Sequence, residues 1–329
     1  MPDVKLLTNS EMRAFKRCRR AWWLRWVRRL RRALPERPGP RSLGSRVHAA
    51  LAAYYAPAGY PDVAGLWATW EALATADRAT VAVAAEEGED PAALAEALEE
   101  ELELGRLMLE GYLEWLADEG ADEGLEVIGP EVERRVPLGP VHGVNVDLLA
   151  LLDLRLRREV DGARLFLDHK TLDQFSRVEP TAHLDEQFRL YHLIERLLGE
   201  AGERTDGALI NLLRRVKRTA RATPPFYRRL EVRHNDHDLR SFWTRVSGTA
   251  VDLMEAELTM AAGLDPRAAA YPNPTRDCAW DCEYFPICGL FDDGSDVESL
   301  LADRYESRHP LAGRYAKLLT ADELREVER

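Results

Sequence analysis

An apolar run ends in charged residues in the segment LFLDHK, residues 165–170. The run is typical of a buried strand, and the Asp-Gly pair at 161–162 just before it predicts a two-residue hairpin turn. Such a turn would place Asp153, on the preceding strand, opposite Lys170. Asp168 lies two residues before Lys170 and therefore on the same face of its strand. We expect Asp153, Asp168 and Lys170 to converge at one end of a sheet.

This trio of side chains has a definite chemistry. Two carboxylates so close together repel each other unless a cation lies between them, and hard cations such as Mg²⁺ or Mn²⁺ prefer oxygen ligands. The Lys170 ammonium can then orient or help deprotonate a metal-bound water, which gives a nucleophile for phosphodiester hydrolysis. Asp147 is a competing ligand, ranked below Asp153 because its partner across the hairpin would fall beyond the strand end. The alternative is a Lys–Asp ion pair on the surface, which would contribute about 0–1 kcal/mol to stability and have no further function.

The elements that must hold these residues are helices followed by a sheet. Helical periodicity predicts helices over 10–32, 42–55, 64–119 with a break near 86–91, 183–200 and 238–263. Apolar β-type runs predict strands over 131–138, 148–158, 163–170 and 207–216. We expect Ser10 to cap the first helix, Gly44 and His48 to lie one turn apart on the second, and Leu165 and Leu167 to point into the core. The fold class is α/β or α+β, with helices packed on the sheet.

Composition limits the class of protein. With 329 residues, 46% of them hydrophobic and 31% charged, the chain is expected to be a soluble globular protein of one large or two medium domains. No apolar run approaches the roughly 20 residues of a membrane helix, and the N-terminus lacks the apolar centre of a secretory signal, so we expect a cytoplasmic location. A phosphate-binding P-loop and a Gly-x-Ser-x-Gly elbow are both missing from the sequence.

Charge is distributed in blocks along the chain. The net charge is −12, yet residues 13–32 contain ten Arg or Lys and no acid, and residues 214–233 are basic again. Residues 86–126 hold sixteen acids against the single base Arg106, as a solvated helical face would. A local field acts on whatever lies nearest, so a nucleic-acid partner stays open. The Trp-rich stretch at 21–26 within the first basic block is interpreted as core rather than as a platform on which bases stack.

The four cysteines form an unequal pattern. Cys278, Cys282 and Cys288 are separated by three and five residues, and Cys18 lies about 260 residues earlier. In a reducing compartment such residues are metal ligands or free thiols rather than disulfides. Three clustered thiolates and a remote one can complete a four-cysteine site. Structural zinc sites more often use close pairs.

The order of these motifs resembles the PD-(D/E)xK nuclease superfamily, and within it the RecB-like branch. The shared pattern is an early helix running from Ser to Cys, a Gly-x-x-x-His helix, an Asp strand, an Asp-x-Lys strand and a Gln-x-x-x-Tyr helix. In this chain the five motifs are Ser10–Cys18, Gly44–His48, Asp153, Asp168–Lys170 and Gln187–Tyr191. The chain departs from the family pattern before the first Asp, where Ala-Leu-Leu stands in place of a nearby Gly, and this leaves the choice between Asp153 and Asp147 open.

The resemblance implies a role for each matched residue. It makes His48, Asp153 and Asp168 metal ligands, with the backbone carbonyl of His169 facing the metal. Lys170 becomes the catalytic lysine, and Gln187 and Tyr191 contact DNA or the catalytic strand. The implied fold is a restriction-endonuclease-like mixed β-sheet core flanked by helices.

The cysteine pattern is similar to that of the iron–sulfur subset of RecB-like nucleases, including the AddB-type and CRISPR-adaptation nucleases. This implies a [4Fe–4S] cluster held by Cys18, Cys278, Cys282 and Cys288, with Zn²⁺ as the alternative and free thiols as a third possibility. The cluster would cap the fold by joining the N-terminal basic helix to the C-terminal region. The implied organisation is a nuclease domain over 1–293, with a helical segment at about 42–125 and a sheet at about 127–215, and a helical tail over 294–329.

Two functions of different classes follow. The first is a metal-dependent DNA nuclease, an exonuclease or end-processing enzyme that acts on single-stranded DNA or on free ends, with the basic segments 13–32 and 214–233 tracking phosphates. The second is a nuclease-fold subunit that binds DNA or acts as a scaffold in a recombination or CRISPR-adaptation complex. The intact Asp–Asp–Lys set favours the first function.

Overall fold

The computed structural model describes residues 4–33, 38–56, 60–81, 90–199, 205–312, 315 and 317–328. The chain forms two compact units, each assembled from separate stretches of sequence. The first unit contains Met1–Leu34, Glu133–Ala150 and Arg240–Arg329. The second contains Pro35–Val132 and Leu151–Leu239. The predicted domain boundary between residues 293 and 294 stays a prediction; the residues on both sides of it belong to the first unit.

The sheet of the second unit is mixed. It is built from the second half of β4 (Val144–Arg158), β5 (Arg164–Leu172), β6 (Gly207–Arg214) and β7 (Tyr227–Val232). β5 runs antiparallel to β4 and parallel to β6, and β7 runs antiparallel to β6. The predicted mixed sheet is thereby confirmed, and it is compatible with a restriction-endonuclease-like fold.

The turn between β4 and β5 is wider than predicted. The last paired residues are Arg158 and Ala163, whose backbone N–H and carbonyl lie 2.8 Å apart, so four residues form the loop. Asp161 causes this, because its carboxylate accepts the Ala163 N–H at 3.0 Å and pairs with Arg158. The prediction of a two-residue turn is therefore wrong, and the cross-strand partner of each β4 residue shifts by two positions along β5. Asp153 therefore lies opposite Asp168 rather than Lys170, since Leu154 pairs with Leu167.

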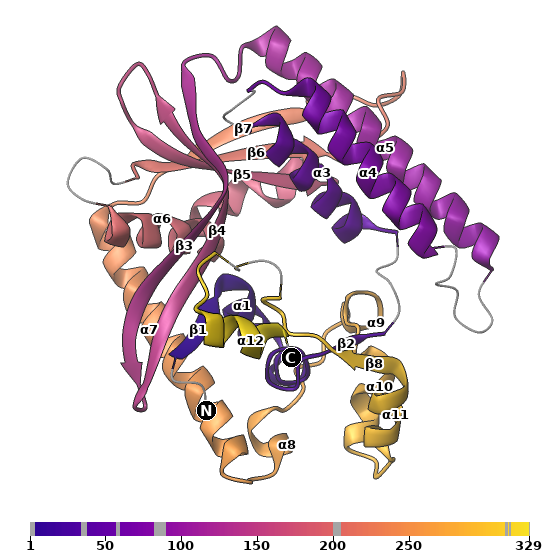
Figure 1. Cartoon of the computed structure of the whole chain (residues 1–329), viewed down its shortest axis with the longest axis vertical. Coiled ribbons are helices and arrows are strands. Elements are labelled where there is room, and N and C mark those ends of the chain that lie inside the picture. The colour runs from indigo at the N-terminus through magenta and orange to yellow at the C-terminus, as the bar shows by residue number, and fades with distance from the viewer. Residues whose placement is uncertain are drawn as a thin grey trace. The chain divides into compact units, whose positions relative to one another are not determined.

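Helices cover both faces of this sheet. Three of them pack together on one face: α3 (Pro40–Tyr54), α4 (Val63–Val81) and α5 (Pro91–Glu119) (Figure 1). Leu165 and Leu167 are fully buried in the core that these helices share, as predicted. Phe166 points to the opposite face, where its ring meets that of Tyr191 at 5.9 Å. Tyr191 belongs to α6 (Glu186–Leu198), whose first turn is capped by Asp185.

The first unit begins with β1 (Val4–Thr8), which pairs in parallel with the first half of β4. The helix predicted over 10–32 is wrong in its extent and in its cap. Thr8, not Ser10, is the N-cap, because its hydroxyl accepts the Glu11 N–H at 3.2 Å. The segment is divided into four elements: α1 (Asn9–Arg17), α2 (Arg19–Trp22), a π-helix (Trp23–Val27) and β2 (Leu30–Arg32). Extended backbone at Cys18, with φ of −160°, ends α1.

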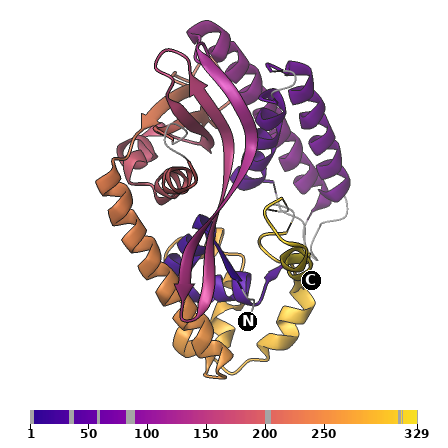
Figure 2. The same ribbon diagram turned by 60° about the vertical axis from the view of Figure 1, so that its left-hand side comes forward.

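The remaining elements connect and complete the two units. β3 (Leu125–Val141) and β4 pair as a long hairpin, seen side by side in Figure 2. β2 pairs antiparallel with β8 (Tyr305–Ser307). The other helices, including short 3₁₀ turns, are Phe175–Arg177, Glu179–Leu184, α7 (Asp236–Ala261), α8 (Pro266–Ala269), α9 (Cys278–Asp281), α10 (Phe285–Cys288), Gly289–Phe291, α11 (Val297–Arg304) and α12 (Ala321–Glu328). Within the described ranges, no helix is both long and apolar enough to cross a membrane.

Candidate active site

The predicted catalytic residues and the predicted ligand His48 lie together in the second unit. They come from a helix on one face of the sheet, from two neighbouring strands, and from a helix on the other face. Asp153 lies on β4 where the pairing with β5 ends, and Asp168 and Lys170 lie two residues apart on β5. His48 comes from α3 and Gln187 from the first turn of α6.

Asp153 is held by two donors. Its Oδ2 lies 3.1 Å from Nδ1 of His48 and accepts the backbone N–H of His169 at 2.8 Å. Burial would raise the pKa of Asp153, but the nearby His48 and the His169 N–H hold it well below its usual value. Burial in turn disfavours the imidazolium of His48, yet the carboxylate of Asp153 raises the pKa of that imidazole. Asp153 is therefore ionised, and a proton on His48 is stabilised beside it.

Asp168 and Lys170 are joined directly and through Gln187. The Lys170 Nζ lies 2.7 Å from Asp168 Oδ2 and donates to Gln187 Oε1 at 2.9 Å. The Gln187 amide nitrogen donates to Asp168 Oδ1 at 2.8 Å and to the Tyr191 hydroxyl at 3.2 Å. Burial, together with the charge of Asp153, raises the pKa of Asp168 to about 6 despite the neighbouring lysine. Burial works against the charge on Lys170 as well, but Asp168 raises its pKa, so the ammonium is charged at neutral pH.

His169 faces the helices rather than the carboxylates. Its ring lies 5.8 Å from the rings of both His48 and Tyr55, and burial lowers its pKa to about 3, so the imidazole is neutral. Asn211 on β6 lies 3.4 Å from its Nδ1 and donates to the Tyr112 hydroxyl at 2.7 Å. This supporting network was missed at the sequence level. Its signal was a lone polar residue, Asn211, inside the apolar strand GALINLLR.

Asp147, the competing ligand, lies in the first unit. It pairs with Arg135, whose Nε is 2.6 Å from its Oδ2, and the same guanidinium binds Glu323 at 2.8 Å. Asp147 is thus part of an ion-pair network of β3, β4 and α12. This placement favours Asp153 as the first carboxylate of the site.

The donor set fits Mg²⁺ or Mn²⁺ bound by few protein ligands. The described residues contain no preassembled group of three or more His, Cys, Asp or Glu side chains for a metal ion. Mg²⁺ is commonly held by one or two carboxylates, with water and substrate phosphates completing its shell. Asp153 and Asp168 supply two carboxylates whose charges interact strongly enough to shift the pKa of Asp168. A divalent cation between them would relieve that repulsion.

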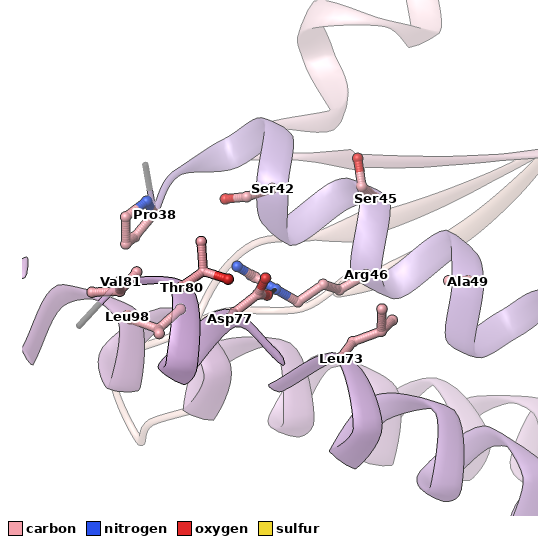
Figure 3. Close-up of a pocket in the computed structure, with 10 residues that line it drawn as sticks. All are labelled: Pro38, Ser42, Ser45, Arg46, Ala49, Leu73, Asp77, Thr80, Val81 and Leu98. Carbon is pink, nitrogen blue, oxygen red and sulfur yellow. Dashed lines mark hydrogen bonds and ion pairs between the residues drawn. The ribbon is translucent and has the colours of Figure 1, made fainter. Parts of the chain in front are cut away.

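A pocket of about 230 Å³ elsewhere in the second unit holds none of the predicted site residues. Figure 3 shows Arg46 of α3 reaching toward Asp77 of α4 among its lining residues. Arg46 also pairs with Glu101, whose carboxylate accepts the Ser42 hydroxyl at 2.7 Å. The buried cation is therefore matched by two carboxylates. This arrangement joins α3, α4 and α5 and leaves no excess positive charge for an anionic ligand.

All four cysteines belong to the first unit and are free, half-buried thiols. Backbone N–H groups of Asn273 and Thr275 point at the sulfurs of Cys18 and Cys278, at 3.4 and 3.3 Å. Burial raises the pKa of Cys282, and the charges of the other three thiolates raise it further. The thiols thus lie within electrostatic range of one another, but in the part of the chain that the structure describes they do not form a group that could hold a metal ion. The predicted iron–sulfur cap is not shown.

The two basic segments carry many ion pairs. In the first, Arg17 pairs with Asp281, Arg20 with Asp292, Arg25 with Glu283 and Arg28 with Glu298. In the second, Arg218 pairs with Glu114, Arg228 with Glu179 and Arg229 with Asp122. Much of the positive charge seen in the sequence is therefore neutralised by acids distant in the chain.

Residues 7–289 match the family model described as PD-(D/E)XK nuclease superfamily. No curated protein matches the chain. The matched span contains the whole site, from His48 on α3 to Tyr191 on α6, and Asp168–Lys170 on β5 has the spacing of the Asp-x-Lys motif. Because the match covers most of the chain, the protein belongs to the PD-(D/E)XK nuclease superfamily, which implies a nuclease-type phosphodiester hydrolase.

Proposed function

We propose that this nuclease is a Mg²⁺- or Mn²⁺-dependent deoxyribonuclease of the RecB-like branch that acts at DNA ends, as an exonuclease or end-processing enzyme. The observation that carries the proposal is the convergence of Asp153, Asp168 and Lys170 on β4 and β5, where the pairing of these two strands ends. A surface ion pair would not need a carboxylate as buried as that of Asp168, which is 2% exposed. The DNA substrate and the preference for ends rest on the resemblance to RecB-like enzymes.

Each residue has a role that its contacts support. Asp153 and Asp168 would hold the ion, which when bound supplies charge neutralisation and a more acidic water. Lys170 offers three donors on a charged ammonium, and Gln187 fixes that ammonium and Asp168 at the same time. Lys170 would orient the attacking water or a phosphate oxygen, and Gln187 would position it. Tyr191 would support Gln187 or contact the strand.

His48 has a conditional part in this scheme. Its Nδ1 lies 3.1 Å from Asp153, whose carboxylate stabilises the charged imidazolium form of the ring. His48 must lose the proton of that charged form before it can bind a metal ion. Neutral His48 could then join the two carboxylates, and the His169 carbonyl is the remaining candidate donor. We propose His48 as the weakest member of the ligand set.

A [4Fe–4S] cluster at Cys18, Cys278, Cys282 and Cys288 is the second part of the proposal, with Zn²⁺ as the alternative. Support comes from the N–H groups that point at two of the sulfurs and from Arg20, whose Nη1 lies 3.9 Å from the Cys288 sulfur. Donors of this kind stabilise thiolates. Anaerobically purified protein should be brown, and Cys282→Ala should lose the colour; a colourless protein that carries one zinc would overturn this part.

The decisive experiment is cleavage of end-labelled single-stranded and duplex DNA with Mg²⁺ or Mn²⁺. Lys170→Ala should lower the rate by about 10²–10⁴-fold, because a positioned proton-handling group is removed. The control is Lys317→Ala, which removes an exposed lysine of the first unit and should cut as the wild type does. Labels on the 5′ and 3′ ends report the polarity of cutting.

If the folded wild type binds DNA ends but cuts neither strand with either metal, the catalytic proposal fails. The protein would then be a nuclease-fold binding or scaffolding subunit, as in a recombination or CRISPR-adaptation complex. Equal rates for Lys170→Ala and the wild type would also contradict the proposal, because the lysine would then be structural.

A further inference from the structure

The first unit contains a pocket of about 460 Å³. Its lining comes from β1, α1, the π-helix, α7, α8 and the C-terminal region, and includes Trp23, Trp26, Glu11, Arg29 and Met260. The proposed catalytic residues belong to the second unit and take no part in it. The pocket therefore needs an explanation of its own.

The backbone at this pocket is unusual in two places. Trp23, Trp26 and Val27 line the pocket, and all three lie in the five-residue π-helix. Arg29, two residues further on, adopts φ of 56°, which is rare for a residue other than glycine. π-Helical turns and left-handed non-glycine residues are unfavourable and are found disproportionately at functional sites. The distortion brings two indoles to one pocket.

Two polar atoms of pocket-lining residues are buried and have no hydrogen-bond partner among the described residues: Glu11 Oε2 and Trp26 Nε1. The Glu11 side chain is 1% exposed, and its other oxygen already accepts from Lys5 at 2.7 Å and from Trp22 at 3.2 Å. Leaving a buried donor or acceptor unsatisfied costs about 1–3 kcal/mol. A ligand that reached them with an acceptor for the Trp26 N–H and a donor for the Glu11 carboxylate would satisfy both atoms.

The charges around the pocket are balanced. Lys5 lies between two carboxylates, 2.7 Å from Glu11 and 2.6 Å from Glu257, and Arg29 is a second cation in the lining. Glu323 is paired with Arg135, and burial lowers the pKa of His309 to about 4, which leaves that ring neutral. Such surroundings offer no net attraction to a free anion. They suit a neutral ligand, and the flat indole rings suit a planar one.

We propose that this pocket binds an unstacked nucleobase of a nucleic-acid strand, between the indoles of Trp23 and Trp26 and with its edge toward Glu11. Every base carries a hydrogen-bond donor beside an acceptor on its edge. The proposal rests on the proposed nuclease function only for the source of the base, because base binding itself requires no cleavage. Trp22, Leu24 and Trp26 are buried, so the interpretation of residues 21–26 as core is confirmed as well.

The test uses the full-length protein and the four deoxyribonucleosides, which carry no phosphate, with deoxyribose as the sugar control. Saturation-transfer NMR and calorimetry should detect saturable binding of at least one nucleoside and none of deoxyribose. Trp26→Phe, which keeps a ring but loses the N–H, should weaken binding about five- to tenfold. Trp23→Leu should weaken it by tenfold or more, since stacking is lost. Trp280→Phe, which changes an indole that is 75% exposed and outside the pocket, should bind as the wild type does.

A second measurement needs no variant. Ultraviolet crosslinking of an oligonucleotide that contains 5-iodouracil should give adducts at Trp23 or Trp26. Adducts only outside the pocket, no saturable nucleoside binding, or unchanged binding in both folded pocket variants would each overturn the proposal. Lys170→Ala should bind nucleosides normally, so a failure of the catalytic proposal and a failure of the pocket are separable.

Discussion

Strand β5 in the second unit and the α1–α2 segment in the first unit both bury charged side chains, but the surroundings of the two charges differ. Asp168 lies near a like charge, Asp153, and its pKa is raised to about 6 by burial and that charge, although Lys170 is 2.7 Å away. Arg20, which is 3% exposed, is matched by Asp292 through two hydrogen bonds of 2.7 and 3.0 Å and by the Cys288 carbonyl at 2.8 Å.

This difference separates a site from a structural contact. A buried guanidinium that donates three hydrogen bonds to oxygen atoms stabilises the fold, and removing it leaves these acceptors without their donor. A buried carboxylate with a raised pKa destabilises the fold at neutral pH, where it must ionise. Shifted pKa values of this kind are typical of functional sites. Replacing the two residues should therefore change stability in opposite directions.

The largest expected effect is at Asp168. Asp168→Asn should abolish cleavage yet raise the free energy of unfolding at pH 7, in the presence of EDTA, by roughly 3 kcal/mol, since one pKa unit corresponds to about 1.4 kcal/mol. The sign follows from the raised pKa. Between about pH 4 and pH 6 the folded state keeps a proton that the unfolded chain has released, so wild-type stability falls as the pH rises through this window. Asparagine has no such dependence, and the gap should open across it.

Denaturant titrations of both proteins from pH 4 to pH 7 measure this gap. Mg²⁺ or Mn²⁺ should stabilise the wild type and leave Asp168→Asn unchanged, because only the wild type keeps both carboxylates. A variant that is less stable than the wild type at pH 7 would show that Asp168 and Lys170 are a structural pair. Asp168 on β5 would then be a structural contact, as Arg20 is.

The next effect is at Arg20. Arg20→Ala should lower the free energy of unfolding of the first unit by about 1–3 kcal/mol, because charge-assisted hydrogen bonds from a buried guanidinium are lost. Arg28→Ala is the matched control: its two hydrogen bonds to Glu298 are exposed, and it should change stability by less than about 1 kcal/mol. Thermal or chemical denaturation of the three proteins makes the comparison. Equal effects for the two arginines would mean that burial does not distinguish them.

The region around β4 and β5 was largely predictable from the sequence because strand geometry is local. Residues two apart share a face, so Asp168 and Lys170 were correctly grouped, and Leu165 and Leu167 were correctly placed in the core. The pairing partner of Asp153 was off by two residues because the Asp161 side chain widens the turn. That error kept the same face of the strand, since the shift was an even number.

The N-terminal segment was less predictable because its partners are remote in sequence. An amphipathic pattern over 10–32 is consistent with one helix, but the Arg20 N–H bonds to the Tyr271 carbonyl at 3.1 Å, and β2 pairs with β8 about 275 residues away. Tertiary contacts of this kind override local propensity. The same limit applies to Asn211, whose role depends on Tyr112, a residue about 100 positions earlier.

The smallest expected effect tests where this segment begins. Thr8→Ala should lower the free energy of unfolding by about 1 kcal/mol, because the Thr8 hydroxyl accepts the Glu11 N–H at 3.2 Å and caps α1. Ser10→Ala, at an exposed position inside the helix, should have an effect within about 0.5 kcal/mol. Chemical denaturation of both variants against the wild type decides between the caps. If Ser10→Ala proved the more destabilising change, the start of α1 would lie at Ser10, and Glu11 would no longer be fixed beside Lys5 by the turn that Thr8 closes.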